Sequence, residues 1–310
     1  MTASIRNESL FGLVAGLLVL FIFSGTLVVS RIGAISSLTI YDVAALRFGV
    51  AALCVLPFIY KVSWINLTWY RAFVLAVIGG AIFALFLLGG FIYAPVADGG
   101  IIVNGTMPIF AAIFTWFIFG EGIGRWRIAG ISLIVIGVAA TGWDALEFGV
   151  PGQWKGHLLF LGAAAFNSAF LTAVRGWKIG ALESLVAVMG LNSLIYLPIW
   201  WLFLPSNITG APLQEILLQG IYQGIVAAFV AGFMIAYAAR TIGSTHQAAI
   251  MSGAPSLALL LAIPLLGEIP TLLSILGVII VTLGILVTLG PNLLKSSISN
   301  ISKSNKNIKS

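Results

Sequence analysis

Apolar residues occur in ten successive runs along this chain of 310 residues, and short polar segments separate the runs. A helix needs about 20 apolar residues to cross a bilayer, because each residue adds about 1.5 Å to its length. Pairs such as Gly120-Glu121, Trp143-Asp144 and Pro151-Gly152 mark the predicted breaks. The runs predict ten transmembrane helices, over Ser9–Ser30, Asp42–Tyr60, Trp69–Tyr93, Asp98–Phe119, Arg125–Gly142, Lys155–Val174, Glu183–Leu204, Gln214–Ala238, Thr245–Leu266 and Thr271–Gly290. The predicted fold class is therefore an all-α integral membrane protein.

Composition agrees with a lipid surrounding and excludes several other classes. Hydrophobic residues make up 60% of the chain and charged residues 8%, whereas a soluble domain carries about 25% charged residues. The net charge is +6, but the 15 Lys and Arg residues are too widely spaced to form a phosphate-binding stripe, so no nucleic-acid partner is expected. A single cysteine, Cys54, excludes a disulfide framework. His157 and His246 lie at span starts and are interpreted as interfacial residues, so no metal or cofactor is expected.

The distribution of Lys and Arg predicts the orientation of the chain, because short cytoplasmic loops retain these residues. With the N-terminus inside, 12 of the 15 cations fall in inner segments, two (Arg31 and Lys155) fall in outer segments, and Arg47 lies within a span. We therefore predict that the N- and C-termini are both cytoplasmic. Residues 295–310 are polar and low in complexity, which predicts a disordered cytoplasmic tail.

An internal repeat divides the chain into two halves, residues 8–142 and 155–290. At an offset of 147 residues, four features of the first half fall on the same residue types in the second half: Pro108 on Pro255, Gly120-Glu121 on Gly267-Glu268, Gly130 on Gly277 and Gly137 on Gly284. At a slightly shorter offset, Ser24–Arg31 parallels Ser168–Arg175. Each half holds five predicted spans, an odd number, so the second half enters the membrane inverted. Inverted repeats are typical of secondary transporters, which bind substrate between the repeats near the midplane.

The doubled pattern of proline, Gly-Glu and spaced glycines resembles the EamA domain of the drug/metabolite transporter superfamily, as does Leu46-Arg47-Phe48 in the second span. The resemblance covers roughly residues 8–290 and implies two inverted five-helix repeats around a central cavity. It also implies a protein of a bacterial cell (inner) membrane that exports or exchanges small molecules. Members of the family move amino acids, other metabolites, nucleotide sugars or drugs.

Two prolines at repeat-related positions, Pro108 and Pro255, lie ten residues into the fourth and ninth predicted spans. A proline removes the amide that would bond the carbonyl four residues earlier, which frees the carbonyls of Asn104 and Met251. Ser252 and neighbouring glycines loosen the same turns. Broken helices at matching positions of two repeats point to a substrate site, so we predict that Pro108, Pro255 and Ser252 line it. The alternative is a kink that serves packing alone.

Polar side chains within the spans are the candidate substrate contacts. Buried amides are costly in hydrocarbon and therefore face a helix interface or a wet cavity. The candidates are Asn104, Asn167, Ser24, Ser168, Tyr93, Tyr237 and Gln247. The alternative for the amides is a hydrogen bond between helices, worth about 0.6–2 kcal/mol, and the serines also suit close packing.

The charged residues within and beside the spans are assigned structural or gating roles. Arg47 is the one cation well inside a predicted span, and its structural alternatives are snorkelling or bonding to carbonyls at a neighbouring helix end. Glu121 and Glu268 follow the fourth and ninth spans and are expected to fix the turns there. Asp98 and Thr245 match under the repeat, and both are residue types that cap helices, so capping is the preferred interpretation. No carboxylate is predicted at mid-membrane, so no proton relay is assigned.

The predicted function is secondary transport of small metabolites by alternating access, with export of amino acids or related compounds preferred. A largely uncharged cavity suits a zwitterion better than a multiply charged phosphate compound. The first alternative is a nucleotide-sugar or drug exchanger, and the second is a non-transporting membrane scaffold. The chain has no Gly-x-Ser-x-Gly or His-Glu-x-x-His motif, and no enzyme activity is expected. The spaced glycines of the fifth and tenth spans are expected to pack inside the chain, so a monomer or a weak homodimer is predicted.

Overall fold

The structure, a computed structural model, describes the backbone of residues 2–308 and the side chains of residues 10–235 and 237–290. Within this part of the chain the regular structure is helical, and strands are absent. Ten helical segments, numbered here as spans 1 to 10, are long and apolar enough to cross a membrane. They are Leu10–Ala34, Ile40–Lys61, Trp69–Tyr93, Val96–Phe119, Arg125–Glu147, Gln153–Gly176, Ala181–Phe203, Leu213–Thr241, Ser244–Leu266 and Leu272–Gly290. The predicted all-α membrane fold is confirmed.

Four spans are single helices, and the other six consist of two or three helical segments each. The single helices are α1 (Thr2–Ala34), α7 (Arg125–Glu147), α8 (Gln153–Gly176) and α15 (Leu272–Ile308), which form spans 1, 5, 6 and 10. The first half also contains α2 (Ile40–Val55) and η1 (Leu56–Lys61) in span 2, α3 (Trp69–Ala76), η2 (Val77–Ile82) and α4 (Phe83–Tyr93) in span 3, and α5 (Val96–Gly99), η3 (Gly100–Asn104) and α6 (Gly105–Phe119) in span 4. The second half contains α9 (Ala181–Leu185), η4 (Val186–Leu191) and α10 (Asn192–Phe203) in span 7, α11 (Leu213–Gln219), η5 (Gly220–Val230) and α12 (Ala231–Thr241) in span 8, and α13 (Ser244–Met251) and α14 (Ala254–Leu266) in span 9.

The interruptions in spans 4 and 9 lie where the two prolines predict them. The π-helical segment η3 directly precedes α6, which contains Pro108. In span 9, α13 ends at Met251 and α14 begins at Ala254, next to Pro255. Three further π-helical segments, η2, η4 and η5, interrupt spans 3, 7 and 8, and no proline within them marks these positions in the sequence. Such segments often occur at functional sites. Spans 3, 4, 7 and 8 therefore contain π-helical segments, and span 9 contains a break between two helices.

Helix α7 ends later than predicted. It continues to Glu147 instead of stopping at Gly142, so Trp143 and Asp144 lie in its last turns and not in a loop. Nothing between them and Glu147 opposes a helix, and the helix stops only before Gly149. The extension matters because it places the Asp144 carboxylate on a rigid element.

The backbone of helix α15 is helical as far as Ile308. The sequence predicts a disordered tail over residues 295–310, of which residues 309–310 lie outside the described part, and that disorder stays a prediction. No glycine or proline follows Pro291, so the polar stretch contains no residue that breaks a helix.

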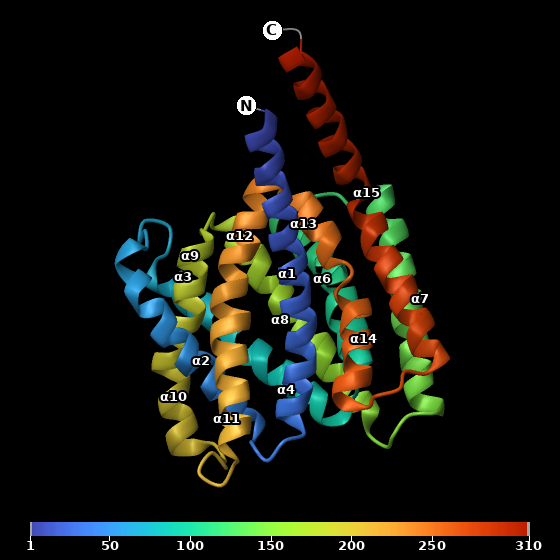
Figure 1. Ribbon diagram of the computed structural model, residues 1–310. Coiled ribbons are helices and arrows are strands. Elements are labelled where there is room, and N and C mark those ends of the chain that lie inside the picture. Colours follow the sequence, from blue (N-terminus) through green and yellow to red (C-terminus); the bar gives the residue numbers. More distant parts are fainter. Residues whose placement is uncertain (1, 309–310) are drawn as a thin grey trace.

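Successive spans run in opposite directions, so the bundle has two faces (Figure 1). The face at which α1 begins and α15 ends is called the N-terminal face here, and the opposite one is called the distal face. The first helix of each half packs against the other half: α1 contacts α12 and α14, whereas α8 contacts α4 and α6. Helices α12 and α14 belong to spans 8 and 9, which are the third and fourth spans of the second half. Helices α4 and α6 belong to spans 3 and 4, the third and fourth spans of the first half, so each half makes the same contact with the other.

Helices α7 and α15 lie side by side along one flank and interlock through their glycines (Figure 1). A Cβ atom added to Gly130 would lie 2.6 Å from the Gly284 carbonyl oxygen, and one added to Gly284 would lie 2.9 Å from the Gly130 oxygen. Gly137 and Gly277 face each other in the same way, at 3.0 and 3.2 Å. The two glycine faces therefore pack against each other within the chain, as predicted.

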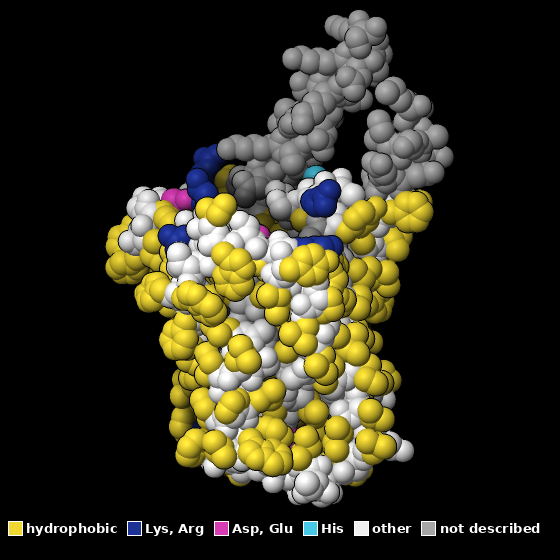
Figure 2. All heavy atoms as spheres, turned by 90° about the vertical axis from the view of Figure 1, so that its left-hand side faces the viewer, with side chains coloured by type: hydrophobic (Ala, Val, Ile, Leu, Met, Phe, Trp, Pro, Cys, Tyr) yellow, Lys and Arg dark blue, Asp and Glu magenta, His cyan; other side chains and the backbone are white. Residues whose placement is uncertain are grey.

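Hydrophobic side chains cover the flank of the bundle that Figure 2 shows. The Lys and Arg side chains visible in that view gather near the N-terminal face, above the apolar belt. Large exposed apolar residues such as Phe117, Trp201 and Phe203 are 71–78% accessible. Such a surface is stable only when lipid covers it, so the helices present their apolar sides to the bilayer.

Candidate functional site

Two serines that match under the repeat make equivalent hydrogen bonds between the halves. Ser24 on α1 is fully buried, and its hydroxyl donates to the Ala254 carbonyl at 3.2 Å. Ser168 on α8 donates to the Met107 carbonyl at 3.0 Å. Each acceptor directly precedes one of the repeat-related prolines, Pro255 or Pro108. The structure thus brings each serine to the helix break of the opposite half.

The predicted amides lie beside the same breaks, with few protein partners. Asn167 donates from Nδ2 to the Met107 sulfur at 3.5 Å, next to Ser168. Asn104 ends η3 and is partly accessible, and its side chain makes no hydrogen bond to any described residue. Ser252 bonds only to its own turn, where its hydroxyl donates to the Ala249 carbonyl at 2.6 Å. The amides therefore keep free hydrogen-bonding capacity near Pro108, and their contact with a substrate stays a prediction.

The other three predicted contacts have separate surroundings. Tyr237 lines a shallow apolar groove of about 420 Å³ between α1 and α12. Gln247 is buried beside Gly16 of α1, and neither polar atom of its amide has a hydrogen-bond partner in the part of the chain that the structure describes. Tyr93 lines a different pocket at the distal face. Tyr93 and Tyr237 therefore line two separate pockets, and neither asparagine lines either of them.

Arg47 is held by neutral groups inside span 2. Its Nη1 donates to Gln223 Oε1 at 3.2 Å, and Gln223 Nε2 donates to Ser30 Oγ at 2.9 Å. No described carboxylate lies within 4.0 Å of the guanidinium. The arginine therefore ties spans 1, 2 and 8 together through an amide, while its gating role stays a prediction.

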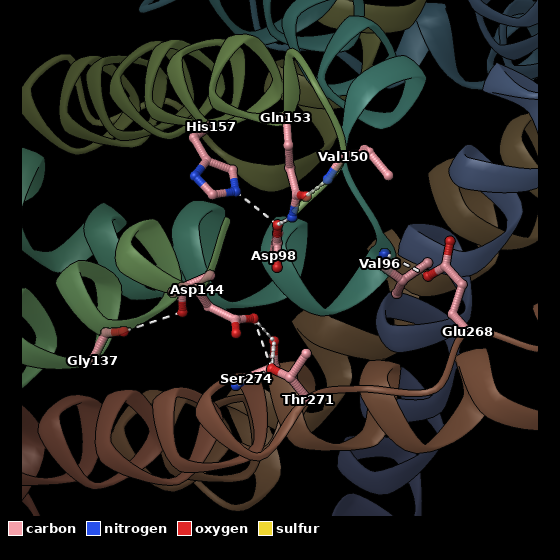
Figure 3. Close-up of polar contacts among 11 residues, drawn as sticks. Val96, Asp98, Gly137, Asp144, Val150, Gln153, His157, Glu268, Thr271 and Ser274 are labelled. Carbon is pink, nitrogen blue, oxygen red and sulfur yellow. Dashed lines mark hydrogen bonds and ion pairs between the residues drawn. The ribbon is translucent and has the colours of Figure 1, made fainter. Parts of the chain in front are cut away.

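Two ion pairs that match under the repeat join the halves at opposite faces. At the distal face, Arg31 Nε at the end of α1 lies 2.9 Å from Glu268 Oε1, in the turn after α14. Glu268 Oε2 also accepts from the Val96 backbone amide at 2.8 Å (Figure 3). At the N-terminal face, Arg175 near the end of α8 pairs with Glu121, in the turn after α6, at 2.5 Å. Both glutamates therefore bridge the two halves, a more specific role than fixing a turn.

A pocket of about 290 Å³ lies at the distal face between spans 1, 3, 4, 5, 6, 9 and 10. Its polar lining includes Arg31, Asp98, Asp144, Gln153, Glu268, Thr271 and Ser274. Figure 3 shows that Asp98 points between His157 and Gln153 of α8. The Asp98 Oδ2 atom lies 2.7 Å from His157 Nε2 and accepts from Gln153 Nε2 at 2.6 Å. Asp98, only 1% exposed, therefore has two donors.

Asp144 occupies another part of this pocket, where α7 meets the start of α15 (Figure 3). Its Oδ2 accepts from Thr271 Oγ1 at 2.7 Å and from Ser274 Oγ at 3.3 Å. Its Oδ1 is buried and has no hydrogen-bond partner among the described residues. The residue is 6% exposed. Asp144 is therefore a buried carboxylate whose Oδ1 receives no hydrogen bond from any described residue.

These contacts correct the capping interpretation of Asp98 and Thr245. Helix α5 is preceded by Pro95 and α13 by Gly243, and neither helix has a side-chain cap. Asp98 instead binds His157, which is therefore more than an interfacial residue. The sequence offered one signal for this pair, because both residues begin spans at the same predicted face. Their contact depends on how α5 and α8 pack, which residue spacing does not reveal.

Comparisons with known proteins agree with this architecture. A sequence profile of the EamA-like transporter family matches residues 10–143 and again residues 154–290. The chain is similar to the "Uncharacterized transporter YdfC" of Bacillus subtilis (strain 168), with 24% identity over 224 residues, which is 70% of each chain. It also superposes on a chain of known crystal structure with a TM-score of 0.59 and 18% identity, over 91% of this chain and 96% of that chain. At this identity the structural likeness concerns the fold alone.

Proposed function

This chain belongs to the EamA-like transporter family, and we propose that it exports amino acids or related small metabolites across a bacterial cell (inner) membrane. Its ten apolar spans make it an integral membrane protein. In this proposal the N-terminal face, with both termini, lies in the cytoplasm. The Lys and Arg side chains that gather near that face support this orientation (Figure 2).

The observation that carries the proposal is the pair of matching ion pairs at opposite faces. Arg31–Glu268 and Arg175–Glu121 each join the first helix of one half to the turn after the fourth helix of the other half. A path to the distal face needs the first pair to separate, and a path to the N-terminal face needs the second to separate. Two inverted halves that rock against each other would break the pairs in turn, which is alternating access.

The substrate, in this proposal, lies between the two broken helices. The polar groups identified at the breaks are amides, hydroxyls and freed carbonyls, with Asn104 and Asn167 beside Pro108 and Ser24 beside Pro255. Such groups bind a zwitterion or a neutral polar molecule, whereas a sugar nucleotide would need several cations for its phosphates. Among the described residues, Arg47 is the cation located well within a span.

Counterflow in proteoliposomes tests this function. Purified full-length protein is reconstituted into vesicles loaded with a mixed pool of amino acids and nucleotide sugars, and exchange is measured for each labelled compound. We expect exchange of at least one amino acid, and a tenfold or greater loss in Asn104→Ala and Asn167→Ala. The matched control is Asn66→Ala, since Asn66 is exposed in the loop before α3.

The possible results separate the alternatives. Exchange of nucleotide sugars alone would replace the amino-acid proposal, and no exchange of any compound would favour a membrane scaffold. Unchanged transport in both asparagine variants would remove the site from between the broken helices. Each variant must elute as the native protein does in gel filtration, so that lost transport is not lost folding.

A further inference from the structure

The distal pocket contains more negative than positive charge. Its lining includes the carboxylates of Asp98, Asp144 and Glu268, and the guanidinium of Arg31. Lys155 lies beside the pocket, with its ammonium 5.8 Å from the centre of the Tyr93 ring. The partners of each carboxylate determine whether any of this negative charge remains uncompensated.

Two of the three carboxylates are already paired within the protein. Glu268 pairs with Arg31, and its second oxygen accepts from a backbone amide. Asp98 accepts from Gln153 and lies within hydrogen-bonding distance of His157. Asp144 has hydroxyl partners only, and no described Lys, Arg or His nitrogen lies within 4.0 Å of it. Asp144 is therefore the carboxylate that lacks a positive partner.

The surroundings of Asp144 orient its carboxylate but do not neutralise it. Thr271 and Ser274 donate to the same oxygen, Oδ2, while Oδ1 has no partner (Figure 3). A buried charge without an opposite charge costs several kcal/mol, and a bound cation offsets that cost. The terminal torsion of an aspartate has a broad and roughly two-fold distribution. Rotation about the Cβ–Cγ bond therefore presents either oxygen to the pocket.

We propose that the distal pocket binds a small organic molecule through its ammonium group, with Asp144 as the carboxylate partner. An ammonium supplies both the positive charge and the hydrogen-bond donors that Oδ1 lacks. The pocket, about 290 Å³, has room for a molecule larger than a single ion, and Phe148, Leu259 and Ala262 give it an apolar wall. The described residues contain no group of three or more His, Cys, Asp or Glu placed to hold a metal ion.

This inference deepens the proposed function, on which it rests for the idea that the bound molecule is cargo. In the proposed orientation the pocket lies on the outer side, so it would hold an exported amine or amino acid close to its release. The specificity follows from charge: a molecule without an ammonium group leaves Asp144 unpaired and adds nothing to offset its burial.

Three compounds with the same branched body separate the ammonium from the rest of the ligand. They are L-leucine, its decarboxylated analogue 3-methylbutylamine, and its deaminated analogue 4-methylpentanoate. Binding to the purified full-length protein in detergent is measured by titration calorimetry at neutral pH and by ligand-induced shifts in unfolding temperature. We expect L-leucine and 3-methylbutylamine to bind and 4-methylpentanoate to bind at least tenfold more weakly.

Variants of two acids on the same helix assign the site. Asp144→Asn should weaken binding of 3-methylbutylamine at least tenfold, and Asp144→Glu, which retains the charge, should recover most of it. The matched control is Glu147→Gln, which removes an exposed charge three residues further along α7 and should bind as the native protein does. If Asp144→Asn fails to fold, the comparison of the three compounds on native protein and Asp144→Glu still decides the matter.

The inference is overturned if 4-methylpentanoate binds as tightly as the amine, if Asp144→Asn binds normally, or if none of the compounds binds. These results are independent of transport, because binding in detergent needs no vesicle. Binding of amines without counterflow would refute the proposed function and leave the pocket assignment intact. Counterflow of an amino acid with normal exchange and binding in Asp144→Asn would refute only the pocket assignment.

Discussion

At the residue scale, two buried aspartates of this chain have opposite surroundings. Asp42, at the start of α2, accepts hydrogen bonds from Trp200 Nε1 at 2.9 Å, Ser206 Oγ at 2.5 Å and the Asn207 amide at 2.9 Å. It also completes a capping box with Thr39. Asp144 accepts from two hydroxyls and leaves one oxygen unpaired. The first arrangement is that of a structural carboxylate, and the second leaves capacity for a ligand.

Removal of the Asp42 carboxylate should therefore be costly to the fold. A hydrogen bond to a charged group is worth about 1.5–3 kcal/mol, and Asp42→Ala removes several of them. It also leaves the Trp200 indole and the Ser206 hydroxyl without this acceptor. We predict that Asp42→Ala lowers the free energy of unfolding by about 3 kcal/mol or more, measured by thermal unfolding of the purified protein.

The matched control is Glu147→Ala, which removes an exposed acid from another helix. Surface substitutions of this kind usually change stability by less than about 0.5 kcal/mol. Equal unfolding temperatures for the two variants would show that the hydrogen bonds of Asp42 do not hold spans 2 and 7 together.

At the element scale, the closeness of α7 and α15 depends on glycine. A Cβ atom on Gly137 would lie 2.7 Å from a Val281 side-chain carbon and 3.0 Å from the Gly277 carbonyl oxygen. We predict that Gly137→Ala destabilises the protein by about 1–3 kcal/mol, because the helices must move apart. The unfolding temperature of the purified protein measures this effect.

Gly142, on the same helix, provides the opposite case. A Cβ atom there would meet nothing within 4 Å, so Gly142→Ala should be neutral or stabilise α7 by up to about 1 kcal/mol through helix propensity. If both alanine variants had the same unfolding temperature, close packing would not be the reason for glycine at position 137.

The ten spans and the two proline breaks could be predicted because they depend on local sequence. Run length and hydropathy determine where a helix crosses the membrane, and Pro108 and Pro255 remove specific backbone hydrogen bonds. The contacts of Asp98 with His157 and of Asp144 with Thr271 could not be predicted, because they join residues that only tertiary packing brings together. The π-helical segments η2, η4 and η5 were also missed, since no proline within them signals them.

At the scale of the whole molecule, the two matching ion pairs differ in how far water reaches them. The side chains of Arg31 and Glu268 are 19% and 20% exposed, whereas those of Arg175 and Glu121 are 60% and 40% exposed. An exposed ion pair is worth about 0–1 kcal/mol, whereas removal of one partner from a more buried pair leaves an uncompensated charge and is more costly. In the proposed mechanism, loss of one partner of the distal pair should therefore destabilise the closed distal face more than the equivalent loss affects the N-terminal face.

Disruption of the distal pair should open the distal face. Ala262 lines the distal pocket and is 2% exposed, so a cysteine at this position reports access from that side. In a Cys54→Ala background, we predict that Glu268→Gln raises the labelling rate of Ala262→Cys by a membrane-impermeant maleimide roughly fivefold or more. A loss of about 1 kcal/mol in the closed state produces a change of this size.

Glu121→Gln is the matched control, since it neutralises the equivalent acid at the N-terminal face. It should leave the labelling rate within about twofold of the parent or lower it, because loss of the exposed pair changes the balance between the faces by less than about 1 kcal/mol.

The exchanged pair Arg31→Glu with Glu268→Arg should restore slow labelling, since the attraction between the halves is re-formed. Equal labelling in the parent and in Glu268→Gln would contradict the view that this pair closes the distal face, and fast labelling in the exchanged pair would show that residue size, not charge, controls access.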